Sequence, residues 1–209
     1  MSFTSANRAV GGKPLYDLQI VNAEKARLDG RIAGMCGLSL HCQSDFNTFS
    51  GEIDTLLVPG GFGAEEKNSN PAAVEWLQRA AAGSRRTGSI CTGTFLLASA
   101  GLLDGRRVTT HWAFASELAR RYPKVNVKPD PIWIQDDQFY TSAGVTAGID
   151  LCLALLEEDH GAAPAWKSRA FSWCSFGDPA IKPNPVSPSP PKQENGSRCT
   201  SYESGWPSI

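Results

Sequence analysis

The segment from Ser89 to Ala98 constrains the fold more than any other, because an apolar strand end runs through one cysteine into an amphipathic helix. A side chain at the centre of such a strand–turn–helix junction is strained, exposed and close to the free N–H groups of the new helix. Those N–H groups and the helix dipole favour a thiolate over a thiol. Cys91 is therefore predicted to be a nucleophile or an anion-sensing group.

Strand and helix patterns alternate on both sides of this junction. Strands are expected at 15–21, 53–58, 107–110, 132–135 and 138–142, of which the last two pair as a hairpin across Asp136-Asp137, with a hairpin-like stretch at 27–42. Helices are expected from Pro71 with Asn70 as its N-cap, from the cysteine to 101, and at 112–121 and 148–158. This alternation predicts an α/β sandwich with a mostly parallel sheet. Pro59-Gly60-Gly61 and Cys91 then both lie at the carboxyl edge of the sheet, where such folds bind ligands.

Chemistry at Cys91 requires a base and an oxyanion hole. The backbone N–H groups of Thr92 and Gly61 are expected to converge on one ligand oxygen, and Gly60 and Gly61 permit close backbone approach. His111 is the candidate base, and a helix-capping or packing histidine is the alternative. The sequence therefore predicts a reactive cysteine without a complete Cys-His-acid triad.

Composition excludes several classes of function. The chain has 209 residues and a net charge of −1, which predicts one main globular domain without a polyanion-binding surface. It contains neither a long apolar run nor a secretory signal, so we expect a cytoplasmic protein with no membrane partner. The six cysteines show no C-x-x-C spacing, so we expect no disulfide framework, metal or cofactor. Cys152 is expected to be a small core hydrophobe.

Several motifs together resemble the ThiJ/PfpI superfamily, and within it the class I glutamine amidotransferase-like domain of AraC-type transcriptional regulators. The motifs are Val58-Pro-Gly-Gly-Phe-Gly63, Ser89-Ile-Cys-Thr-Gly-Thr-Phe95, Ala100-Gly-Leu-Leu-Asp-Gly-Arg-Arg107, Thr109-Thr-His-Trp112, Thr141-Ser-Ala-Gly-Val-Thr-Ala-Gly-Ile-Asp150 and Glu157-Glu-Asp-His-Gly161. The resemblance covers roughly Phe3 to Gly161.

The resemblance implies a flavodoxin-like three-layer sandwich with a cysteine nucleophile elbow. It also implies a homodimer, and a second, C-terminal domain with two helix-turn-helix units. A small-molecule ligand is expected over Cys91. The residues expected around this ligand are Gly60, Gly61, Phe62, Thr92, Thr110, Gly144 and Thr146.

Three departures from the family pattern lead to further expectations. The domain at 1–161 is expected to lack the first strand of the family, with its Gly-Pro-Leu-acid segment. Thr92 follows the cysteine where the protease-like branch has histidine. After Gly161 the resemblance stops, and 162–209 is expected to be an aberrant Pro/Ser-rich tail, disordered from about 178.

The tail has a specific explanation. Codons for 165–185, read one base earlier, can encode an amphipathic helix followed by Arg-Arg-Pro-Gly, which is the pattern expected of the family. We therefore expect that a frameshift replaced the last helix and the DNA-binding domain, and that this chain does not bind DNA.

Three functional interpretations stay open from the sequence. The first is a small-molecule-sensing domain of an AraC-type regulator, truncated so that its helix-turn-helix output is absent. The second is a stand-alone ThiJ/PfpI-type cysteine enzyme that resembles isonitrile hydratase. The third is a damaged gene product without a present function.

Overall fold

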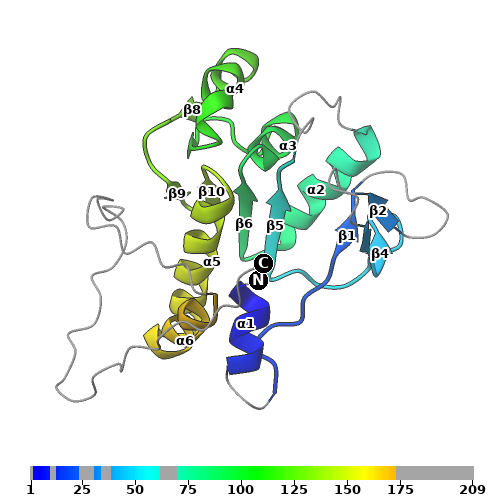
Figure 1. Ribbon diagram of the computed structural model, residues 1–209. Coiled ribbons are helices and arrows are strands. Elements are labelled where there is room, and N and C mark those ends of the chain that lie inside the picture. Colours follow the sequence, from blue (N-terminus) through cyan, green and yellow to red (C-terminus); the bar gives the residue numbers. More distant parts are fainter. Residues whose placement is uncertain (1, 10–12, 24–30, 34–38, 62–69, 173–209) are drawn as a thin grey trace, which may run out of the picture.

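A four-stranded sheet forms the centre of the molecule, with helices on both faces (Figure 1). The computed structural model describes residues 2–9, 13–23, 31–33, 39–61 and 70–172. The helices are α1 (Ser2–Ala9), α2 (Pro71–Gly83), α3 (Gly93–Ser99), the 3-10 helix η1 (Trp112–Phe114), α4 (Ala115–Arg121), α5 (Val145–His160) and α6 (Ala162–Ser172). The strands are β1 (Val21–Asn22), β2 (Arg31–Ala33), β3 (Ser39–His41), β4 (Ser44–Asp45), β5 (Thr55–Pro59), β6 (Arg86–Ile90), β7 (Arg107–Val108), β8 (Asn126–Val127), β9 (Trp133–Asp136) and β10 (Phe139–Ser142).

The central sheet has the strand order β5-β6-β10-β9. The first three strands run parallel, and β9 is antiparallel to β10. Two-stranded ladders join β1 to β4, β2 to β3 and β7 to β8. The α/β class with a largely parallel sheet, expected from the alternating pattern, is therefore confirmed.

Alternation along β5 separates the two hydrophobic layers. Leu56 and Val58 pack into one core with side chains from α2 and α3. Leu57, between them, packs against Leu151 and Leu155 of α5 on the opposite face. Because successive strand residues point to opposite faces, one apolar strand holds a helix layer on each side.

Several local predictions are confirmed. The Asn70 side chain accepts a hydrogen bond from Ala72 N, and Pro71 opens α2. These are the usual roles of an N-cap and of a first-turn proline. Asp137 adopts a left-handed φ of 58° in the hairpin between β9 and β10. The short ladder of β2 and β3 is antiparallel, as the hairpin-like pattern at 27–42 predicted.

The strand predicted at 15–21 is shorter than expected. Only Val21 and Asn22 join a ladder, and they pair with Ser44 and Asp45. Leu18 and Ile20 are 41% and 42% exposed. Alternation alone does not make a strand, because the backbone also needs an adjacent ladder to accept its hydrogen bonds.

The segment assigned to the aberrant tail begins with an ordered helix. Helix α6 packs against α1 and α5, and Ala165 is buried with Ala6 and Leu156. The small residues of its first turn allow this close packing, although they do not form a helical apolar period. The remainder of the predicted tail, 173–209, lies outside the described residues. No described helix has both the length and the apolar character needed to cross a membrane.

Candidate functional site

Cys91 occupies the bend between β6 and α3, and its backbone is strained. It has a φ of 58°, a region that non-glycine residues rarely adopt. Cys91 is half-buried, as is Ile90 before it. The first four residues of β6, 86–89, are buried. A left-handed conformation costs of order 1–3 kcal/mol and persists only when surrounding contacts impose it.

Three hydrogen bonds hold the Cys91 backbone in this conformation. Its N–H donates to Ser142 O of β10 over 2.9 Å. Its carbonyl oxygen accepts from Thr110 Oγ1 at 2.9 Å and from Thr94 Oγ1 at 3.1 Å. Both polar backbone groups are therefore fixed by β10, α3 and the segment after β7.

A cluster of buried serine and threonine side chains surrounds these bonds and links β6, β10 and α3. Ser89 Oγ lies 2.8 Å from Thr94 Oγ1, whose one proton is shared between Cys91 O at 3.1 Å and Thr109 O at 3.2 Å. Thr141 Oγ1 accepts from Thr109 N at 2.9 Å, and Ser142 Oγ donates to Ser89 O at 3.4 Å. Sequence reasoning missed this cluster, although each member lies at the end of a strand or the start of α3.

The Gly60–Gly61 loop lies directly against the start of α3. A Cβ placed on Gly60 would lie 2.5 Å from Thr92 N and 2.7 Å from Gly93 N. A Cβ on Gly93 would lie 2.2 Å from Val58 O. Both glycines are therefore required by close backbone approach. The loop and the cysteine bend meet at one sheet edge, as the sequence predicted.

The amide of Gly61, predicted to serve an oxyanion hole, already has an acceptor. Gly61 N–H donates to Thr92 Oγ1 at 3.1 Å, and the same hydroxyl donates to Gly61 O at 3.0 Å. In this state a ligand oxygen must compete with Thr92 for that amide.

His111 has the geometry of the capping and packing alternative. Its Nδ1 accepts a hydrogen bond from Ala113 N at 3.3 Å, so it caps η1. Its ring stacks on Trp112, with ring centroids 5.6 Å apart. Within the described chain, no hydrogen bond joins the ring to Cys91. Because Nδ1 accepts, hydrogen-bond geometry assigns the proton of the neutral ring to Nε2.

The other predicted ligand residues divide into two groups. Thr110 is fully buried and directs its hydroxyl to the Cys91 carbonyl, so it supports the bend. Gly144 is half-buried, and a Cβ placed there would lie 3.9 Å from His111 Cδ2. Thr146 is exposed on the first turn of α5. Phe62 lies outside the described residues.

The other two described cysteines are unsuited to nucleophilic chemistry. Burial raises the pKa of Cys152 to about 11 and also raises the pKa of Cys42. Both thiols therefore retain their protons near neutral pH. Over the described ranges, no group of three or more His, Cys, Asp or Glu side chains is arranged to hold a metal ion.

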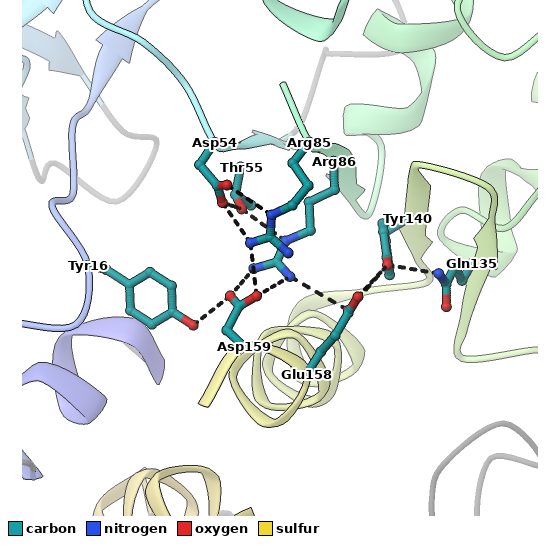
Figure 2. A network of polar contacts seen from close by, with 9 residues as sticks. All are labelled: Tyr16, Asp54, Thr55, Arg85, Arg86, Gln135, Tyr140, Glu158 and Asp159. Atoms are coloured by element: carbon teal, nitrogen blue, oxygen red, sulfur yellow. Dashed lines mark hydrogen bonds and ion pairs between the residues drawn. The ribbon is translucent and has the colours of Figure 1, made fainter. Parts of the chain in front are cut away.

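A second polar cluster lies at the opposite end of the sheet, where β6 begins and α5 ends (Figure 2). The Arg86 side chain is 2% exposed and pairs with Asp159 through both terminal nitrogens. Arg86 Nε also donates to Thr55 Oγ1 at 2.9 Å. Glu158 lies 3.6 Å from the Arg86 guanidinium. This network joins β5, β6 and α5.

The Asp159 carboxylate collects further donors. Arg85 bridges it to Asp54, with N–O distances of 2.9 and 2.8 Å, and the Tyr16 hydroxyl donates to it over 2.9 Å. Burial acts to raise the pKa of Asp159, but the hydrogen bonds from Arg86 and Tyr16 outweigh it and hold the pKa below its usual value. The Arg85 hydrogen bonds lower the pKa of Asp54 to about 2. The cluster is therefore a structural ion-pair network, distant along β6 from Cys91.

Most of the chain is similar to known proteins. The model of the DJ-1/PfpI family matches residues 13–158. The chain is 42% identical over 147 residues to the HTH-type transcriptional regulator CdhR of Pseudomonas aeruginosa, covering 70% of this chain and 42% of CdhR. It is 38% identical over 106 residues to isonitrile hydratase of Pseudomonas putida, covering 51% of this chain and 45% of the hydratase. The chain thus spans less than half the length of either relative.

Solved structures show the same fold. A ThiJ/PfpI family protein from Pseudomonas syringae superposes with a TM-score of 0.70 at 23% identity, covering 85% of this chain and 71% of that protein. An AraC family transcriptional regulator from Pseudomonas putida gives a TM-score of 0.66 at 20% identity, covering 82% of this chain and 88% of that one.

Proposed function

This chain belongs to the DJ-1/PfpI family, and from that premise we propose that it is the small-molecule-sensing domain of an AraC-type transcriptional regulator. The similarity to CdhR carries the proposal, because it extends over most of the chain. The regulator would act in the cytoplasm as a homodimer. Its sensing site would lie at the sheet edge that contains Cys91.

The strained bend supports a specific role for Cys91 in this proposal. We assign it to a nucleophile elbow, because its φ of 58° and three backbone hydrogen bonds hold the side chain at the junction of β6 and α3. The thiol would contact a small amino acid or amine. Gly61, Gly144 and Thr146 would border the ligand, and His111 would contact it through the ring edge beside Gly144.

Helix α5 offers a route from the site to the rest of the protein. Its N-terminus follows Gly144, and its C-terminus carries Asp159, which is fixed to Arg86. At 16 residues it spans about 24 Å. A ligand changes the output only if it binds two states of the domain with different affinities. In this proposal, a shift of α5 would be the difference between those states.

Thermal unfolding in the presence of single amino acids and amines tests the proposal. A ligand at one hundred times its Kd stabilises a domain by about 2.7 kcal/mol, which raises the Tm of a chain of this size by roughly 5 to 10 °C. Blocking Cys91 with iodoacetamide fills the space over the thiol and should abolish the shift. The C152S variant, away from the site, should retain it. Equal shifts for the blocked and unblocked chains would contradict the assigned site.

A cysteine enzyme is the second candidate, favoured by the similarity to isonitrile hydratase. Such an activity would add water to the isonitrile carbon and release an N-substituted formamide. Incubation with an alkyl isonitrile, followed by mass spectrometry of the product, measures it directly. Formamide production by the wild-type chain, lost in Cys91→Ser and kept in Cys152→Ser, would favour the enzyme over the sensor.

A further inference from the structure

One hydroxyl group forms hydrogen bonds with both the N–H and the C=O of Gly61. Thr92 Oγ1 accepts from Gly61 N at 3.1 Å and donates to Gly61 O at 3.0 Å. A threonine hydroxyl has one proton to donate and two lone pairs, so a single side chain can make both bonds. Thr92 is 2% exposed, whereas Gly61 is exposed and has open space on its Cβ side. The buried Thr92 side chain therefore fixes the backbone of the exposed Gly61.

The position of Thr92 makes this bonding unusual. It is the N-cap residue of α3, where a threonine side chain normally accepts from the second or third amide of its own helix. Thr92 makes no such capping bond. Its hydroxyl is directed instead to Gly61, which lies on the other loop of the site. Helix α3 therefore lacks a side-chain N-cap bond, because the Thr92 hydroxyl bonds to the Gly61 backbone instead.

The neighbouring glycine restricts how the loop can respond. A Cβ on Gly60 would lie 2.5 Å from Thr92 N and 2.6 Å from Thr92 Oγ1, so the loop is already at its closest approach to α3. The Cβ side of Gly61 faces open space. Gly61 is therefore not pressed against α3 as Gly60 is, and glycine backbone freedom allows its amide to turn away from the Thr92 hydroxyl.

We infer that Thr92 is a positioning residue, which keeps the Gly61 amide occupied until a ligand bearing a carboxylate or similar oxyanion takes its place. The inference rests on the proposed sensing function for its biological meaning. A carboxylate forms a stronger hydrogen bond with an amide than a neutral hydroxyl does. An anionic ligand therefore displaces the hydroxyl more readily than a neutral ligand of the same size.

Two alkylating reagents of nearly equal shape test this inference. Iodoacetate carries a carboxylate and iodoacetamide a neutral amide; in both reactions the Cys91 sulfur attacks the methylene carbon and iodide leaves. The ratio of the two rate constants cancels any change in the amount of thiolate. Removing the hydroxyl with Thr92→Val frees the Gly61 amide for the carboxylate, so the iodoacetate-to-iodoacetamide ratio at Cys91 should rise roughly 3- to 10-fold.

Thr92→Ser is the matched control, because it keeps the hydroxyl and removes only the methyl group. Its ratio should stay within about twofold of the wild-type value. Peptide mapping by mass spectrometry separates labelling of Cys91 from that of the other five cysteines. An unchanged or lower ratio in a folded Thr92→Val chain overturns the inference, as does an equal rise in Thr92→Ser.

Amide hydrogen exchange in the wild-type chain gives a second test that needs no variant. The exposed Gly61 amide should exchange at least about tenfold more slowly than an unprotected amide, because Thr92 Oγ1 accepts a hydrogen bond from it. Exchange at the unprotected rate overturns the inference. Neither experiment requires the natural ligand. A failure here is therefore distinct from a failure of the sensing proposal, which the thermal-shift panel tests.

Discussion

Alanine at Gly60 should destabilise the protein strongly, whereas alanine at the adjacent Gly61 should not. The Cβ added at Gly60 would lie 2.5 Å from Thr92 N, 2.6 Å from Thr92 Oγ1 and 2.7 Å from Gly93 N. Two of these atoms belong to the backbone and cannot rotate away. At Gly61 the added Cβ meets nothing within 4 Å. The two variants therefore make the same chemical change in one loop, and only one of them clashes.

The magnitude follows from the contacts that Gly60→Ala would disturb. The loop and α3 must separate by roughly 1 Å, and overpacking of this kind typically costs about 1–3 kcal/mol. The same movement strains the two hydrogen bonds between Gly61 and Thr92, each of which contributes about 1 kcal/mol. The expected total is about 3 kcal/mol. Gly61→Ala should change stability by less than about 1 kcal/mol, and reduced freedom of the unfolded chain favours a small gain.

Urea unfolding followed by circular dichroism measures both variants. With a typical slope for a small domain, a loss of 3 kcal/mol lowers the unfolding midpoint by about 1 to 2 M. The alkylation rate of Cys91 should also change in Gly60→Ala, because the loop beside the thiol moves. If the two variants unfold within about 0.5 kcal/mol of each other, the close approach of Gly60 to α3 is refuted.

Three further outcomes are expected. Asp159→Asn removes the nearer of the two carboxylates beside the buried Arg86 and leaves only Glu158, at 3.6 Å; it should cost about 3 kcal/mol in urea unfolding, since breaking a buried ion pair costs more than its formation contributes. The pKa values of Asp54 and Asp159 are held below their usual range, so their contribution to stability is present above about pH 4 and should fade as the pH falls toward 2; urea midpoints between pH 6 and 2.5 should fall, and an unchanged midpoint would contradict the paired state. Thr110→Val removes one hydrogen bond to the Cys91 carbonyl and should cost about 1 kcal/mol. It should also alter the alkylation rate of Cys91, whereas an unaltered rate would show that the bonds to Thr94 and Ser142 are enough to hold the bend.

Local sequence patterns predicted the parts of this fold that depend on neighbours in the chain. Asn70 and Pro71 mark the start of α2, because capping is a property of adjacent residues. Asp137 turns the hairpin of β9 and β10 for the same reason. The bend at Cys91 was predictable because an apolar strand pattern runs directly into a helix pattern.

The ion-pair network and α6 could not be predicted from local sequence patterns. Arg85 and Arg86 meet Asp159 only because β6 and the end of α5 lie side by side. Acidic and basic residues at helix and strand ends are usually solvated, so their types alone do not reveal a buried network. Helix α6 was missed because its packing on α1 and α5 depends on contacts that no short pattern records.

The α/β class, the bend at Cys91 and the glycine loop beside it could all be inferred from the sequence, because strand periodicity, capping and glycine spacing act over a few residues. Which groups face one another at this bend depends on how the strands and helices pack. This packing directs the Thr92 hydroxyl to Gly61, directs Thr94 and Thr110 to the Cys91 carbonyl, and leaves His111 as a cap. Serine and threonine hydroxyls rotate and bond to whatever backbone group packing brings near them. Their partners are therefore fixed by the packed strands and helices, not by neighbours in the chain.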